Sequence, residues 1–201
     1  DLRNIRMVTI DGDDAKDLDD AVSLEMMPDG KYLLGVHIAD VGHYVQEDSV
    51  LDAEAFNRAT SVYLADRVIP MLPQKLSNGL CSLNAQEDRL ALSCFMLIGK
   101  NGDIASHEIC ESVIRVNHRL TYKNVNRMLL ERDEKLSDIY RDVLPMLKNM
   151  EKLQQLLEKK RKNRGAITFE MPESKVVLDK KGRAVRIEWR QSLIAEKMIE
   201  E

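Results

Sequence analysis

The chain has 201 residues, of which 44% are hydrophobic and 32% are charged, and its formal net charge is −4. This length and balance suit one folded domain, or a large part of one, and exclude a disordered chain. No apolar run approaches the ~18 residues that a membrane span needs, and the sequence does not open on a signal-peptide pattern. We therefore expect a soluble, monomeric protein of the cytoplasm that does not bind membranes.

Charge is distributed unevenly along the chain. Residues 1–60 contain 14 acidic and 5 basic side chains, whereas residues 61–201 contain 20 acidic and 25 basic ones. Such a division suits a cation at one end and a polyanion at the other, although proteins that bind neither also show it. The three cysteines are widely spaced, and the four histidines lack paired ligand spacing. These features predict free thiols in a reducing compartment and no zinc site.

The first half of the chain predicts a strand on each side of an acidic segment. Runs of β-forming apolar residues predict strands at 8–10, 21–26 and 32–38. Ser49 is expected to cap a helix that runs to about Ala59, because apolar residues recur there at helical spacing. Residues 62–64 form a short apolar run. Residues 68–84 contain two prolines and a glycine, which predict a loop with at most one turn of helix.

The second half predicts a hairpin, helices and further strands. The strands are expected at 89–98, 104–116, 168–170, 176–178 and 184–189. Thr121 is expected to cap one helix, through Leu130, and Ser137 a longer one that ends at Gly165 and is bent or split by Pro145. A last helix covers SLIAEKMIEE. The predicted class is therefore α+β, with a mostly antiparallel sheet and packed helices.

The segment MVTIDGDDAKDLDD concentrates negative charge between the first two predicted strands. It places six carboxylates within ten positions, at Asp11, Asp13, Asp14, Asp17, Asp19 and Asp20. Carboxylates this close raise one another's pKa unless a cation neutralises them. Oxygen ligands favour Mg²⁺, Mn²⁺ or Ca²⁺ over zinc, and loops of this kind occur in phosphoryl-transfer enzymes. We therefore expect a divalent metal site in this loop.

The spacing of the loop can be compared with three other structures or sites. A Ca²⁺-binding EF-hand is excluded, because its sixth position would be Lys16 instead of Gly and its twelfth Val22 instead of Glu. A phosphatase signature of the form DxDx[TV] is met at Asp11 and Asp13, but Ala15 stands where Thr or Val is expected. A solvated loop that binds nothing is the remaining alternative.

Three long motifs resemble the catalytic domain of the ribonuclease II/ribonuclease R family. They are TIDGDDAKDLDDAVSLE, VHIADVGHYV, and TSVYLADRVIPMLPQKLSNGLCSLN with DRLALSC. The resemblance runs from Asp1 to Glu201. It implies an enzyme that hydrolyses single-stranded RNA processively from the 3′ end with Mg²⁺, or Mn²⁺ in its place, and releases nucleoside 5′-monophosphates. DNA is not an expected substrate.

The resemblance also implies roles for individual residues. Asp11 and Asp20 would hold the ion, Asp17 would complete or support its shell, and Asp19 would be needed for cleavage but not for RNA binding. The RNA-binding residues that it implies are Tyr63 and Phe169, which would stack on the terminal bases, and Glu200, which would contact ribose. Phe169 reads equally well as strand core, and Glu200 could be exchanged with Glu201.

The family pattern extends beyond these 201 residues. The resemblance implies a later segment that supplies an arginine to the scissile phosphate, and RNA-binding barrels on both sides of the catalytic domain. We expect residues 1–201 to be part of that domain, weakly active or inactive alone. The alternatives are a non-catalytic module of the same fold that binds RNA or a protein, and the metal-dependent phosphatase. The intact aspartates argue against a module without chemistry.

Overall fold

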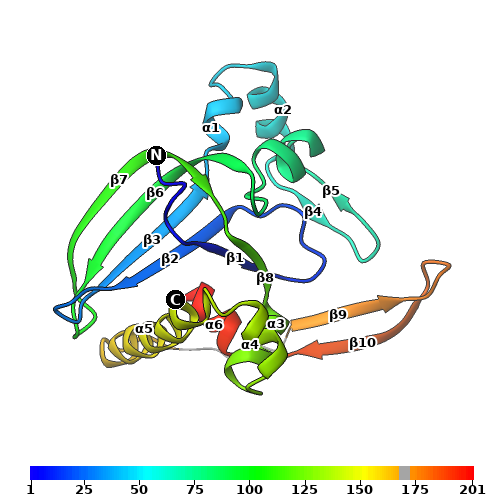
Figure 1. Cartoon of the computed structure of the whole chain (residues 1–201). Helices are drawn as coiled ribbons and strands as arrows, with labels where there is room; N and C mark the ends of the chain where they lie inside the picture. Colours follow the sequence, from blue (N-terminus) through cyan, green and yellow to red (C-terminus); the bar gives the residue numbers. More distant parts are fainter. Residues whose placement is uncertain (168–172) are drawn as a thin grey trace.

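A six-stranded sheet forms the centre of the computed structural model, which describes residues 1–167 and 173–201 except the side chains of Glu173 and Arg190 (Figure 1). The sheet order is β7, β6, β3, β2, β1, β8, with β1 (Val8–Asp11), β2 (Asp20–Met26), β3 (Tyr32–Ala39), β6 (Asp88–Ile98), β7 (Ile104–Arg115) and β8 (His118–Thr121). All neighbours are antiparallel except β1 and β8, which are parallel. The predicted α+β class with a mostly antiparallel sheet is confirmed.

The helices begin largely where capping residues stand in the sequence. They are α1 (Val41–Tyr44), α2 (Val50–Arg58), the π-helix η1 (Leu76–Leu80), α3 (Tyr122–Leu129), α4 (Glu134–Ile139), α5 (Leu144–Asn163) and α6 (Ile194–Glu200). Ser49 and Thr121 each accept a hydrogen bond from a backbone N–H of the first turn, at 3.2 Å in both cases, so both predicted caps are confirmed.

The predicted cap at Ser137 is wrong. Asp133 caps α4 by accepting a hydrogen bond from the backbone N–H of Leu136 at 3.0 Å. The predicted long helix is divided between α4 and α5. Pro145 lies in the first turn of α5, where backbone N–H groups have no partner within the helix, so the missing N–H of proline costs no hydrogen bond. Gly165 has φ +89 just after α5, which confirms the predicted stop.

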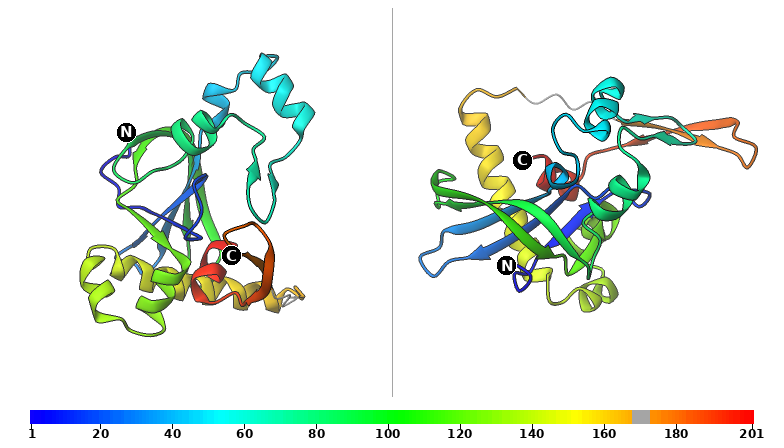
Figure 2. Two further views of the ribbon diagram at one scale, coloured as in Figure 1. Left: turned by 90° about the vertical axis from the view of Figure 1, so that its right-hand side faces the viewer. Right: turned by 90° about the horizontal axis from the view of Figure 1, so that it is seen from above.

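Two short antiparallel ribbons stand apart from the central sheet. One pairs β4 (Val62–Tyr63) with β5 (Val68–Ile69), and the other pairs β9 (Glu173–Leu178) with β10 (Ala184–Arg190). Residues 68–69 were expected to be loop, so β5 corrects that prediction. Both ribbons project on the side of the molecule where β1 leads into β2, one above and one below in Figure 1, and Figure 2 agrees.

The two faces of the sheet bury separate apolar clusters. On one face, β2 packs through Val22 and Leu24 against Leu147, Met150 and Leu153 of α5. On the other face lie buried residues from the N-terminus, the acidic segment, η1 and the segment after it. Within the described part of the chain, no helix has the length and apolarity to cross a membrane.

Candidate functional site

The acidic loop, residues 11–20, joins two neighbouring strands at one end of the sheet. Asp11 is the last residue of β1 and Asp20 is the first of β2, and because Val8 lies opposite Val22, these two aspartates lie at the same end of the sheet. Leu18, between Asp17 and Asp19, is completely buried. The loop is therefore packed against the rest of the fold through Leu18 and is not wholly exposed to solvent.

Burial raises the pKa of Asp11, Asp19 and Asp20 in this loop, and neighbouring carboxylates add to the effect at Asp11 and Asp19. Partial burial, followed by the charges of Asp20, Asp17 and Asp19, raises the pKa of Asp11 to about 6, against a lowering by Arg119. The pKa of Asp19 is raised by partial burial and then by Asp17 and Asp20. Burial raises the pKa of Asp20. Asp11, Asp17, Asp19 and Asp20, for which the resemblance implies catalytic roles, therefore interact electrostatically with one another.

Tyr63 reaches this cluster from the β4–β5 ribbon. Its hydroxyl donates a hydrogen bond to Oδ2 of Asp17 at 2.8 Å, and this bond is the main reason why the pKa of Tyr63 is raised. The residue is 66% exposed, so its ring is open to a ligand. Its position beside the acidic loop agrees with the predicted role in base stacking, which stays a prediction.

Tyr122 is a neighbour of the cluster that the sequence did not reveal. In the parallel pairing of β1 with β8, Asp11 lies opposite Thr121, which places Tyr122 next to that end of the sheet. Burial and the charges of Asp11, Asp20, Glu196 and Glu200 raise its pKa to about 12, so it is a hydrogen-bond donor at neutral pH. Its only sequence signal is its place after the helix cap.

Glu200 and Glu201 have different surroundings in the structure. Buried Asn126 holds α6 against α3, because its side chain donates to Glu196 at 3.0 Å and accepts from the backbone N–H of Ala195 at 2.9 Å. Glu200 lies four residues after Glu196, and its charge contributes to the raised pKa of Tyr122. Glu201 instead pairs with Arg161 of α5 at 2.7 Å, and its side chain is 8% exposed. Glu200 is therefore the better candidate for a ligand contact.

The other candidates lie at the edge of the site or outside it. Asp13 and Asp14 are exposed, and Asp14 pairs with Lys175 of β9 at 2.7 Å. Phe169 lies outside the described residues. Three bases at the end of α5 form ion pairs with acidic side chains: Lys160 with Asp103, Arg161 with Glu201, and Lys162 with Glu158.

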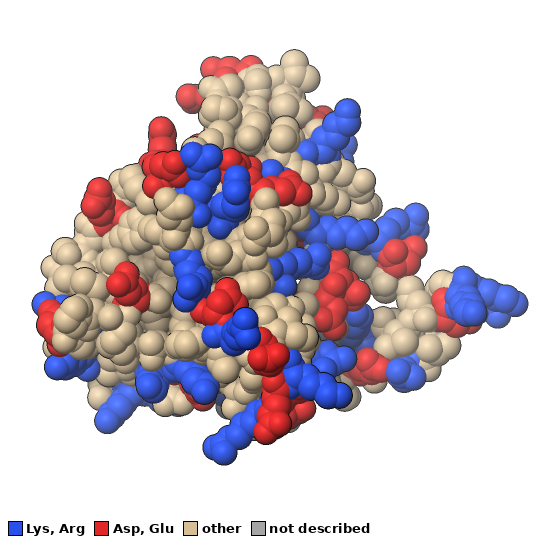
Figure 3. All heavy atoms as spheres, viewed as in Figure 1, with Lys and Arg blue, Asp and Glu red and all other residues tan. Residues whose placement is uncertain are grey.

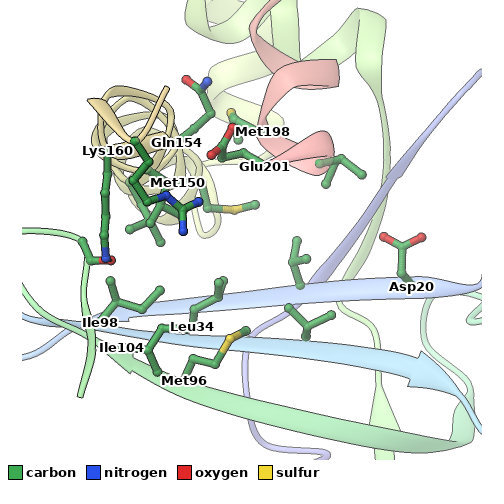
Figure 4. A pocket seen from close by; sticks show the side chains of 17 residues that line it. Asp20, Leu34, Met96, Ile98, Ile104, Met150, Gln154, Lys160, Met198 and Glu201 are labelled. Atoms are coloured by element: carbon green, nitrogen blue, oxygen red, sulfur yellow. The ribbon is translucent and has the colours of Figure 1, made fainter. Parts of the chain in front are cut away.

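An apolar hollow of about 380 Å³ opens beside the acidic loop, between the sheet and α5. Asp20 lies at one end of the hollow and Lys160 at the other, with Leu34, Met96 and Met150 between them (Figure 4). On the surface in Figure 3, Lys and Arg side chains surround the acidic groups between the two ribbons. An anion that reaches the acidic loop is therefore met by positive charge at its rim.

The chemistry of the loop fits a hard divalent cation. Clustered carboxylates whose pKa values are raised are stabilised in their charged form when a cation neutralises them. Among residues 1–167 and 173–201, no three His, Cys, Asp or Glu side chains converge into a ready metal cage. Mg²⁺ requires only one or two protein carboxylates, since water and substrate phosphate complete its shell. The ligand set of Asp11, Asp17 and Asp20 therefore stays a prediction.

The fold and the site define an α+β domain that gathers carboxylates at one end of an antiparallel sheet. The chain belongs to the RNB domain family, whose match covers residues 1–201. This result confirms the resemblance seen in the motifs.

Two curated relatives and one solved structure that resemble this chain are ribonucleases R. Ribonuclease R of Thermotoga maritima is 50% identical over 202 residues, which cover 100% of this chain and 28% of that protein. Ribonuclease R 1 of Lactococcus lactis is 49% identical over 200 residues, which cover 100% of this chain and 24% of that protein. The structure of Mycoplasma genitalium RNase R in complex with ribose methylated single-stranded RNA superposes with TM-score 0.90 at 34% identity and covers 99% of this chain and 31% of that one. The chain spans about a quarter of the length of these two curated relatives.

Proposed function

We propose that the chain is part of the catalytic domain of an exoribonuclease that degrades single-stranded RNA processively from its 3′ end and releases nucleoside 5′-monophosphates. The observation that carries the proposal is the set of mutually repelling carboxylates at Asp11, Asp17, Asp19 and Asp20 beside the exposed residue Tyr63. The two ribonuclease R relatives and the RNA-bound RNase R structure support the same substrate class.

We propose that Asp11 and Asp20 hold Mg²⁺ or Mn²⁺ and that Asp17 completes or supports the shell. When bound, the ion supplies positive charge that stabilises the developing charge on the phosphate and favours ionisation of a nearby water. Asp11 must be deprotonated to serve as a ligand, and its pKa of about 6 allows this at neutral pH. The neighbouring Arg119 acts in the same direction, because its charge lowers the pKa of Asp11.

The reaction is an in-line hydrolysis of the last phosphodiester bond. Asp19 orients the attacking water by accepting a hydrogen bond from it. The water oxygen bonds to phosphorus, the bond from phosphorus to the 3′ oxygen of the preceding nucleotide breaks, and that oxygen leaves as a new 3′ hydroxyl once protonated. The products are a nucleoside 5′-monophosphate and an RNA shorter by one nucleotide, which can enter the next cycle.

The substrate end is held by groups of different chemistry. The Tyr63 ring stacks on a terminal base, which contributes about 1–3 kcal/mol per base and tolerates any sequence. Phe169 is the proposed partner ring in this stack. Glu200 accepts a hydrogen bond from a ribose 2′-hydroxyl, which DNA lacks. RNA is therefore the expected polymer, and DNA is not.

The test uses the full-length protein, end-labelled single-stranded RNA and Mg²⁺. We expect nucleoside 5′-monophosphates from the earliest time points, with loss of activity in EDTA and recovery when Mn²⁺ is added. RNA binding without turnover would contradict the proposal in favour of a non-catalytic module. Turnover of small phosphomonoesters without any effect on RNA would favour the phosphatase alternative.

The chain alone is a separate test. We propose that residues 1–201 retain the ion-binding loop but hydrolyse RNA weakly or not at all, since the family pattern places a phosphate-binding arginine in a later segment. The same assay with the isolated chain is expected to yield little mononucleotide. Efficient release by the chain alone would show that the later arginine is dispensable.

A further inference from the structure

The segment that follows η1 lies under the acidic loop in the interior of the molecule. Cys81, Ser82 and Leu83 are all buried, and Ser82 and Leu83 have no exposed surface. This segment belongs to the motif GLCSLN, which the proposed chemistry does not use. Cys81, Leu83 and the loop residue Leu18 are members of one apolar cluster, so segment and loop pack directly against each other.

One hydroxyl group connects the segment to the loop. Ser82 Oγ accepts a hydrogen bond from the backbone N–H of Leu18 at 3.1 Å and donates one to the carbonyl oxygen of Lys16 at 2.9 Å. The two bonds fix the backbone immediately before and after Asp17. A serine hydroxyl can serve as donor and acceptor at the same time, which is the requirement here.

Backbone bonds extend this attachment along the loop. Leu83 N–H donates to the carbonyl oxygen of Leu18 at 2.8 Å, and Ala39 N–H donates to that of Asp19 at 2.9 Å. The backbone from Lys16 to Asp19 is therefore held from two sides. These bonds hold the backbone of Asp17 and Asp19 in place. Because the Leu18 side chain between them is buried, the side chains of Asp17 and Asp19 are directed away from the interior.

Ser82 is itself held in place. Its carbonyl oxygen accepts a hydrogen bond from Nε of Arg89 at 2.8 Å. The Arg89 side chain is only 13% exposed and also pairs with Glu87. Because Arg89 belongs to β6, this hydrogen bond attaches Ser82 to the central sheet.

We infer that Ser82 is a positioning residue for the carboxylates of the acidic loop: its buried hydroxyl fixes the backbone on both sides of Asp17 and so determines where Asp17 and Asp19 stand relative to the ion and the water. The inference rests on the proposed function for its catalytic consequence. The mechanical part, that Ser82 orders the loop, stands on the hydrogen bonds alone.

The test compares Ser82→Ala with Ser93→Ala in the full-length protein. Ser93 is also completely buried and its hydroxyl also has two hydrogen-bond partners, the side chains of His37 and Ser112, but it lies on β6. Both variants lose a buried hydroxyl, so both are expected to unfold at lower temperature. Only Ser82→Ala should speed hydrogen exchange in residues 12–20 and change the response to metal.

The readouts separate positioning from stability. With Mn²⁺ as the probe, Ser82→Ala is expected to raise the half-saturating concentration or lower kcat by about 10- to 100-fold, as for other groups that orient metal ligands. The KM for RNA should stay close to the wild-type value, and Ser82→Cys, which retains a weak donor and acceptor, should be intermediate. If Ser82→Ala does not fold, the Ser82→Cys values decide the matter.

The outcomes also separate this inference from the proposed function. If loop exchange and Mn²⁺ binding in Ser82→Ala match those of Ser93→Ala, Ser82 does not position the loop, whatever the enzyme does. If the wild-type protein binds Mn²⁺ but does not hydrolyse RNA, the proposed function fails, whereas the exchange and Mn²⁺-binding measurements still test Ser82.

Discussion

The hydroxyl of Tyr63 donates a hydrogen bond to the carboxylate of Asp17 across 2.8 Å, and this bond joins the β4–β5 ribbon to the acidic loop. The residue that is proposed to stack on RNA is thereby attached to one that is proposed to support the ion. The contact fixes the hydroxyl end of the tyrosine and leaves the residue 66% exposed. Substrate binding and metal binding are therefore expected to be coupled through this pair.

Two substitutions of Tyr63 separate these roles. We expect Tyr63→Ala to lengthen the final undegraded product, because the terminal bases lose a stacking partner that contributes about 1–3 kcal/mol per base. Tyr63→Phe keeps the ring and loses only the bond to Asp17, so the end product should stay the same while the Mg²⁺ dependence changes. Product length on denaturing gels checks both variants, and an unchanged end product in Tyr63→Ala would remove Tyr63 from the RNA site.

Asp19→Asn is expected to abolish hydrolysis and leave RNA affinity nearly unchanged. The substitution preserves size but removes the charge that orients the water, and losses of about 10²- to 10⁴-fold are usual for such groups. Single-turnover rates and filter binding measure the two quantities. Asp13→Asn is the matched control, because it makes the same change on an exposed residue of the same loop. Retained turnover in Asp19→Asn would exclude Asp19 from the mechanism.

The local features of the site could be predicted from sequence. Six aspartates between two apolar runs are visible without a fold. The predicted strands end just before Asp11 and begin just after Asp20, and the structure includes these two aspartates in β1 and β2. The hairpin around Asn101-Gly102 and the caps at Ser49 and Thr121 follow from residues that are close in sequence, where turn and cap chemistry decides the outcome.

The features that sequence could not supply depend on distant pairing. Tyr122 reaches the cluster only because β8 pairs with β1, and β8 is four residues long, too short for a periodic signal. Ser82 meets the loop across 64 positions, and nothing in the local sequence marks its hydroxyl as a loop anchor. Ser137 was an eligible cap by type, but Asp133 occupies the position where the backbone turns.

The raised pKa of Asp11 predicts a pH-dependent term in stability. The pKa is about 6 in the folded chain against 3.8 for an ordinary aspartate. The folded state therefore binds this proton more tightly, so the stabilisation is fully present below pH 3.8 and is lost as pH rises through about 6. In EDTA we expect the urea midpoint to fall over this range more steeply in the wild type than in Asp11→Asn.

The comparison with Asp11→Asn is needed because another group acts in the opposite direction. Burial lowers the pKa of His37 to about 4, so its contribution is lost as pH falls over the same range. Both proteins share His37, and their difference isolates Asp11. Mg²⁺ should restore the wild-type midpoint at pH 7 and have a smaller effect on Asp11→Asn. Parallel pH profiles in EDTA would show that Asp11 does not carry the shifted pKa.

Substitutions of the adjacent acids Glu200 and Glu201 are expected to affect different properties, RNA preference and stability. Glu201→Gln weakens the pair with Arg161, whose side chain is 42% exposed, so the free energy of unfolding should fall by about 1 kcal/mol or less. Glu200→Gln should leave stability close to the wild-type value and reduce the preference for an RNA over a DNA 3′ end. Competition between matched ribo- and deoxyribo-oligonucleotides measures that preference, and urea unfolding measures the first effect. If Glu201→Gln reduces the RNA preference and Glu200→Gln does not, the two assignments are reversed and Glu201, which follows α6, contacts the ribose.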